Sequence, residues 1–205
     1  MDFIGQTTRI VTDRQIDLPG SVMAIGAFDG VHRGHQHLIS GAVNEARTMG
    51  TTSIVWTFDP PPKVVFGRAE QLCSLDEKLA RIAHHGPDVI VVAQFNRLYA
   101  GRSAETFLED LARANPRRIH VGADFRFGHK QSGDVAQLGK RFDVTVPMPV
   151  VCADGQVVSS TRIRALRASG QRAEADSLQG PFGMASQLAG RLLTKDLRHH
   201  RTQVE

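Results

Sequence analysis

The chain has 205 residues, of which 41% are hydrophobic, enough to bury the core of one compact domain. Its 25 lysines and arginines exceed its 21 aspartates and glutamates by only four charges, too small a surplus to indicate a nucleic-acid-binding face. The two cysteines, Cys73 and Cys152, are too few for a disulfide framework. This composition excludes a disulfide-rich secreted scaffold and argues against a nucleic acid partner.

The N-terminal sequence MDFIGQTTRIVTDRQ lacks the basic and then apolar pattern of a signal peptide. The longest apolar runs, such as Val89–Ala93, are too short to cross a bilayer. We therefore expect a cytoplasmic protein with no membrane partner; the sequence leaves the oligomeric state open.

Short apolar runs alternate with segments of helical periodicity along most of the chain. In chain order, the pattern predicts a strand at 21–28, a helix at 34–49, a strand at 51–58, a helix from Ser74 to Ala83, a strand at 88–93, a helix from Ser103 to about Ala114, strands at 117–123 and 142–150, and helices at 159–170 and 171–180. Such alternation predicts an α/β fold, a parallel sheet flanked by helices.

The final stretch, residues 190–205, becomes polar and basic and contains His199 and His200. We interpret these histidines as part of a solvated end of the chain. One domain is therefore expected over residues 1–183, followed at 184–205 by a C-terminal helix or tail.

A glycine-rich segment, GAFDGVHRGHQHL at Gly26–Leu38, joins the first predicted strand to the first predicted helix. In an open α/β sheet, ligands bind beyond the carboxyl ends of the strands, where free N–H groups at a helix start attract anions. His32 and His35 lie three residues apart across that helix start, so both imidazoles can face a phosphoryl group. The segment predicts nucleotide phosphate binding.

Two other interpretations of these histidines stay open. They can simply cap or pack the turn that the glycines shape, or they can bind a metal, although no third ligand follows at a suggestive spacing. His37 points to another face of the helix and is left out of the site.

Five segments together resemble the FMN adenylyltransferase module of bacterial bifunctional riboflavin kinase/FAD synthetases, and they occur in that family's order. They are Gly26–His35, Thr57–Pro60, Val121–Gly128, Gly133–Val135 and Ser159–Arg164. The resemblance covers about residues 20–183. It implies a Rossmann-like nucleotidyltransferase fold and the reaction of ATP, bound to Mg²⁺, with FMN to give FAD and pyrophosphate.

The resemblance also implies roles for individual residues, while the metal ligands stay unknown. His32, His35 and Arg164 are the expected catalytic residues. Asp29 is expected to orient the turn or a histidine, and Arg162 to face outward. The expected ATP-binding residues are Gly26, Phe28, Asp29, Gly30, His32, Gly34, His35, Ser160, Thr161 and Arg164. The expected FMN-binding residues are Phe58, Asp59, Asp124, Phe125 and Phe127.

Two features depart from the family's pattern. A histidine that commonly separates two prolines in the second segment is absent from Asp59-Pro60-Pro61-Pro62. Only residues 184–205 follow the stretch over which the resemblance holds, about residues 20–183, and no Pro-Thr-Ala-Asn motif occurs. We therefore expect no riboflavin kinase domain.

Two alternatives for function remain at this point. The motifs that contain His32, His35 and Arg164 are expected to contact the nucleotide rather than the molecule that accepts the AMP group. The chain could therefore act on another phosphorylated small molecule. It could also be a flavin- or nucleotide-binding paralogue without turnover.

Overall fold

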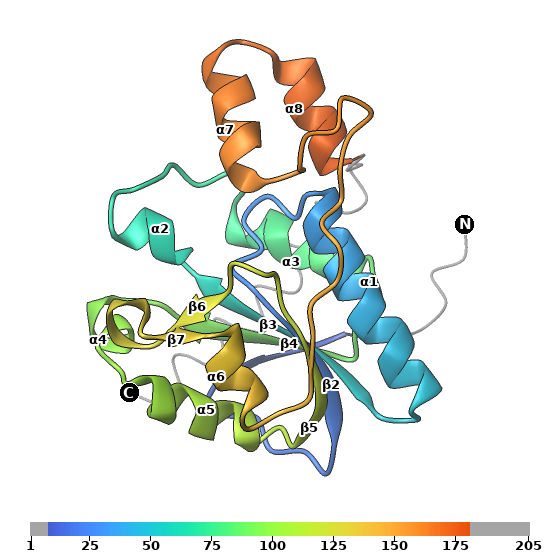
Figure 1. The fold of residues 1–205 in the computed structure, drawn as a ribbon, viewed down its shortest axis with the longest axis vertical. Helices are drawn as coiled ribbons and strands as arrows, with labels where there is room; N and C mark the ends of the chain where they lie inside the picture. Colours follow the sequence, from blue (N-terminus) through green and yellow to red (C-terminus); the bar gives the residue numbers. More distant parts are fainter. Residues whose placement is uncertain (1–7, 181–205) are drawn as a thin grey trace.

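Six strands form a parallel sheet in the order β1-β4-β3-β2-β5-β8 (Figure 1). The computed structural model describes residues 8–180, so the tail expected at 184–205 lies outside the described residues. The strands are Arg9–Thr12 (β1), Ser21–Ile25 (β2), Thr52–Asp59 (β3), Val89–Gln94 (β4), Pro116–His120 (β5) and Val144–Thr145 (β8). This is the α/β fold predicted from the alternating pattern.

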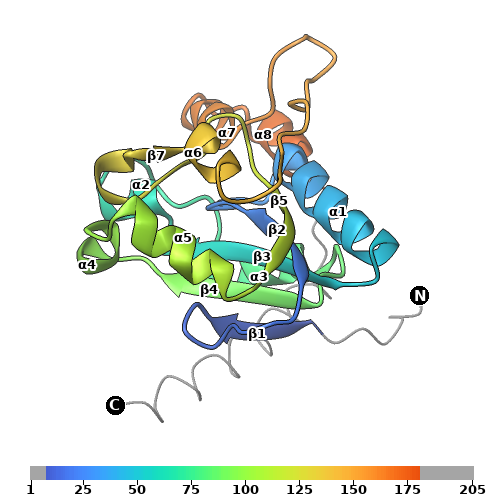
Figure 2. The ribbon, with the colours of Figure 1, turned by 60° about the horizontal axis from the view of Figure 1, so that its bottom comes forward.

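Helices cover both faces of the sheet because alternate residues of each strand point to opposite sides. Val22 and Ala24 of β2 pack with helices α1 and α3, whereas Met23 and Ile25 pack with α5 and α6. These helices span Arg33–Thr48 (α1), Leu75–Ala83 (α3), Ala104–Ala112 (α5) and Val135–Gly139 (α6). In Figure 2, β1 lies at one edge of the sheet, beside β4.

Two further helices, α7 (Ser160–Ala168) and α8 (Arg172–Gln179), stand together near the start of α1 (Figure 1). Their apolar side chains form a small separate core with Leu72, which precedes α3, and Val158. The α7–α8 pair therefore belongs to the edge of the sheet where the predicted site lies. No helix within residues 8–180 is both long and apolar enough to cross a membrane.

Several element boundaries differ from the prediction. The strand expected at 21–28 ends at Ile25, because Phe28 leaves extended geometry with φ 47°. The strand expected at 142–150 is reduced to Val144–Thr145, and the prolines that follow it, Pro147 and Pro149, cannot donate ladder hydrogen bonds. The strand expected at 117–123 begins at Pro116 and ends at His120.

The sequence pattern missed β1 and the short elements other than β8. The chain between β5 and β8 forms an antiparallel hairpin, β6 (Arg126–Phe127) and β7 (Gly133–Asp134), with a 3₁₀ turn at its tip, His129–Gln131. Short helices α2 (Pro62–Val65) and α4 (Arg97–Ala100) follow the carboxyl ends of β3 and β4. These pieces are too short to show periodicity.

Candidate active site

The turn between β2 and α1 has an unusual backbone. Phe28, Gly30 and Val31 have φ values of 47°, 78° and 42°. Positive φ is costly for a β-branched residue such as Val31, so surrounding contacts must hold this conformation. Phe28 and Val31 are both fully buried, which places their side chains in the core rather than toward a ligand.

Two glycines of this turn make room for neighbouring rings. A Cβ at Gly26 would lie 2.9 Å from the Phe28 ring, and one at Gly34 would lie 3.2 Å from the His32 ring. The glycines therefore let the backbone of the turn pack closely against its own side chains.

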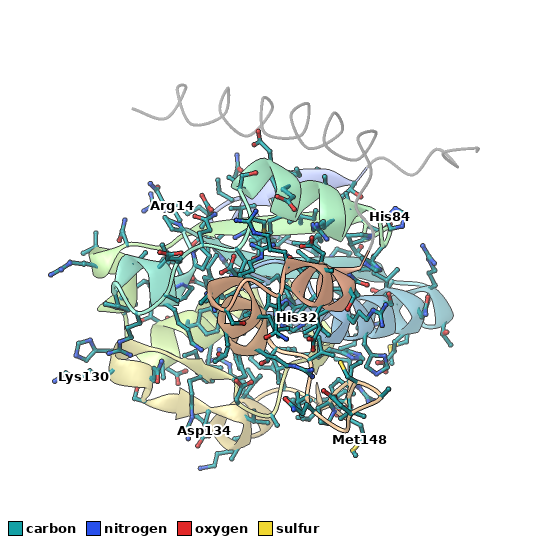
Figure 3. All side chains as sticks on the ribbon, turned by 90° about the horizontal axis from the view of Figure 1, so that it is seen from above. Arg14, His32, His84, Lys130, Asp134 and Met148 are labelled. Carbon is teal, nitrogen blue, oxygen red and sulfur yellow. The ribbon has the colours of Figure 1, made fainter. Side chains whose placement is uncertain are left out.

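The two histidines are brought together at the start of α1. His32 is the N-cap, its Nδ1 accepts a hydrogen bond from the His35 N–H at 3.3 Å, and the two rings stack with centroids 3.6 Å apart. The Phe28 ring meets His35 edge-on at 5.2 Å. Seen from above, His32 lies beside the α7–α8 pair (Figure 3).

Both imidazoles are neutral at neutral pH. Burial, together with Arg164, lowers the pKa of His32 to about 4. Burial, together with His32 and Lys78, lowers the pKa of His35 well below its usual value. Because His32 Nδ1 accepts a backbone hydrogen bond, its proton belongs on Nε2, which makes Nε2 the donor available to a ligand.

This pKa shift predicts that the protein loses stability on mild acidification. Between pH 6.5 and about 4 the unfolded chain binds a proton at His32 that the folded chain does not, so the free energy of unfolding falls as pH falls. The contribution is fully present above pH 6.5, and its loss amounts to about 3 kcal/mol at pH 4 and below. Urea unfolding from pH 7 to 4 should show a steeper decline for the parent than for His32→Asn; parallel curves would contradict it.

Asp29, which is buried, and Arg164, which is partly buried, form an ion pair that joins the turn to α7. Arg164 Nη2 donates to Asp29 Oδ2, and Arg164 Nε donates to the Glu70 carbonyl at 2.8 Å. The other carboxylate oxygen of Asp29 accepts from the Leu72 N–H at 3.0 Å. Asp29 thus orients the turn, one of its two expected roles, through Arg164 and Leu72.

The start of α7 also bonds to the turn. Ser160 Oγ donates to the Asp29 carbonyl at 3.0 Å, and Ser159 caps the helix by accepting from the Arg162 N–H at 3.2 Å. Arg162, expected to face outward, is only 14% exposed and pairs with Asp154 and Glu174. Thr161 is exposed.

A buried lysine that the sequence analysis missed lies beneath the site. Lys78 of α3 has no exposed surface; its Nζ donates to the Phe58 carbonyl at 2.7 Å and lies 3.8 Å from Asp59 Oδ1. Burial lowers the pKa of Lys78, while Asp59 opposes the shift. The lysine thereby fixes the carboxyl end of β3.

A cavity of about 450 Å³ opens beside the end of β3. Its walls are aromatic, and cationic side chains, including Lys63, Arg68, Arg97 and Arg126, also line it. The aromatic lining residues are Phe58, Phe66, Phe95, Tyr99, Phe107 and Phe127. This size and lining suit a planar, partly apolar ligand that carries negative charge.

Only some of the residues expected to bind FMN line this cavity. Phe58 and Phe127 line it, and Phe125 stacks on Phe127 with ring centroids 5.6 Å apart. Asp59 lies beside Lys78, and Asp124 is exposed; neither is among the lining residues. His32 and His35 are also outside the lining, so the candidate site consists of two neighbouring parts that meet at the end of β3.

Comparisons with known proteins show which family this chain resembles. A family model described as FAD synthetase matches residues 14–162. A putative bifunctional riboflavin kinase/FMN adenylyltransferase of Geobacillus thermodenitrificans is 47% identical over 165 residues, which are 80% of this chain and 92% of that protein. The bifunctional riboflavin kinase/FMN adenylyltransferase of Escherichia coli K12 is 36% identical over 180 residues, 82% of this chain but only 57% of that protein.

Among solved structures, one titled macrolide-efflux protein from Streptococcus pneumoniae superposes with a TM-score of 0.73 at 28% identity. The match covers 85% of this chain and 61% of that one. This chain therefore spans well under two thirds of the length of some of its relatives.

Proposed function

The chain belongs to the FAD synthetase family, and from this premise we propose that it transfers AMP from ATP to FMN, giving FAD and pyrophosphate. The proposal assigns this activity to the domain expected over residues 1–183. The observation that carries it is the stacked, neutral pair His32 and His35 at the start of α1, next to an aromatic and cationic cavity.

The reaction needs alignment and charge stabilisation more than a protein nucleophile. A phosphate oxygen of FMN attacks the α-phosphorus of ATP, and the bond from that phosphorus to the bridging oxygen breaks, so pyrophosphate leaves. His32 Nε2 and the His35 ring donate to the phosphate oxygens of ATP as negative charge builds up. If Mg²⁺ is bound to ATP, it would supply further positive charge for the leaving pyrophosphate.

The cavity supplies the acceptor side. Phe58 and Phe127 contact the isoalloxazine ring, and a cation such as Arg97 or Arg126 attracts the FMN phosphate. Lys78 donates a hydrogen bond to the carbonyl of Phe58, which lines the cavity. The charge of Lys78 also acts on His35, so this lysine connects the two parts of the site.

Arg164 is proposed to act on the nucleotide while it is held by the turn. Two of its nitrogens already bond to Asp29 and Glu70, so its contact with phosphate uses the remaining nitrogen, Nη1, of the fork. A lysine cannot make the Asp29 and Glu70 contacts and still reach a ligand. We expect Arg164→Lys to raise the KM for ATP about tenfold. Steady-state kinetics would test this, and an unchanged KM would remove Arg164 from the site.

The function is tested by incubating the purified protein with MgATP and FMN and separating the flavins by chromatography. Formation of FAD with stoichiometric pyrophosphate is the expected result. Tight FMN binding without FAD would favour a binding paralogue, and turnover of ATP only with another phosphorylated acceptor would favour the other alternative.

A further inference from the structure

The last residue of α8 is inserted into the turn that precedes α1. Gln179 is only 2% exposed, and its Nε2 donates to the Gly30 carbonyl at 2.9 Å. Its side-chain oxygen accepts from Arg167 Nη2, and Arg167 Nη1 donates to the Leu72 carbonyl at 3.0 Å. Both ends of the Gln179 amide are therefore used, one on the turn and one on α7.

The backbone of Gln179 continues the same contact. Its carbonyl accepts from Gln36 Nε2 at 2.7 Å, and that amide also donates to the Val31 carbonyl at 2.8 Å. Gln179 is thus connected, directly or through Gln36, to the carbonyls of Gly30 and Val31, two of the three residues of the turn that have positive φ. A Cβ at Gly30 would lie 2.8 Å from Gln179 Nε2, which shows how closely the two approach.

The opposite end of Gly30 is held by a thiol. The Gly30 N–H donates to Cys73 Sγ at 3.2 Å, and Cys73 is 6% exposed. Gly30 is therefore fixed at its N–H by the segment before α3 and at its carbonyl by α8. Loss of either contact should loosen the turn, in which Val31 keeps a costly positive φ, and expose the Cys73 thiol.

We propose that Gln179 is a positioning residue that holds the β2–α1 turn in its nucleotide-binding conformation, so that α8 sets the affinity for ATP. The inference rests on the proposed function. Because Gln179 bonds to the turn and is not among the residues that line the flavin cavity, its effect is selective for the nucleotide.

The test uses Gln179→Glu and Gln179→Leu in a Cys152→Ser background, which leaves Cys73 as the one thiol in the sequence. Glutamate keeps the acceptor for Arg167 but loses the donor to Gly30, whereas leucine loses both. Gln171→Ala, an exposed glutamine before α8, is the matched control. The rate at which a disulfide reagent labels Cys73 reports opening of the turn, since burial raises the pKa of that thiol to about 11.

We expect both Gln179 variants to label about tenfold faster than the parent and to raise the ATP dissociation constant about tenfold, with FMN binding within about twofold. Gln171→Ala should match the parent. Unchanged labelling and ATP binding would overturn the proposal, as would equal weakening of ATP and FMN, which would indicate general loosening.

If the Gln179 variants fail to fold, Arg167→Met removes the donor that orients the Gln179 amide and should shift labelling and ATP binding in the same direction by a smaller factor. No shift in that variant would also overturn the proposal. If the parent binds ATP but makes no FAD, the proposed function fails, while the labelling and binding comparisons still decide the role of Gln179.

Discussion

Replacing His35 with alanine is expected to lower kcat for FAD formation by about a hundredfold or more, because one preorganised donor to developing phosphate charge is lost. The structure places this ring against His32 and leaves its Nδ1 buried without a hydrogen-bond partner among the described residues. A buried polar atom without a partner costs stability, so a functional demand is the simplest reason to keep it. The free energy of unfolding should change by only about 1 kcal/mol.

Two variants sharpen the test. His37→Ala removes an exposed histidine from the same helix and should leave kcat near that of the parent. His35→Gln keeps a donor of similar reach and should recover part of the lost rate. A His35→Ala enzyme with normal kcat and a lowered melting temperature would show that this histidine only packs the turn.

The sequence predicted that His32 and His35 lie together at a helix start, because the signals for that placement are local. A buried strand, a glycine-rich turn, two histidines three apart and the helix Arg33–Thr48 all lie within one short segment. The geometry of such a segment follows from backbone sterics and helix periodicity. The helix expected at 159–170 rests on equally local signals, since serine is a common capping residue and Ser159 caps α7.

The cavity could not be predicted in this way, because its walls are assembled from distant segments. Phe66 follows α2, Phe95 follows β4, and Tyr99 lies in α4, a helix too short to show periodicity. Which aromatic rings share a cavity depends on strand order, and apolar spacing does not encode that order.

Lys78 did leave a readable signal. Leu75, Lys78, Leu79 and Ile82 share the i, i+3, i+4, i+7 spacing of one helix face, so a lysine stands within an apolar stripe. A buried lysine needs a partner, which the structure supplies at the end of β3. Gln179 left no such signal, because its partner in the turn, Gly30, lies 149 residues earlier in the sequence.

Replacing Asp29 with alanine should have the largest effect on stability of any change at the site. The Asp29 side chain is 5% exposed, and it is the acceptor for both the Leu72 N–H and the Arg164 guanidinium. Removing it leaves a partly buried cation and a buried N–H without their acceptor. Breaking a buried pair in this way costs about 3–5 kcal/mol, a large part of the stability of a typical domain.

Three comparisons separate the charge from the packing in a urea unfolding series. Asp29→Asn keeps an oxygen for the Leu72 N–H and should lose less stability than the alanine variant. Asp29→Ala combined with Arg164→Met removes the uncompensated charge and should regain part of the loss, as expected for coupled neighbours. Asp154→Ala breaks a surface pair with Arg162 and should change stability little. If Asp29→Ala and the double variant unfold at the same urea concentration, the ion pair does not hold the turn. The turn would then be held by the hydrogen bonds that Ser160 and Gln179 donate to its backbone carbonyls.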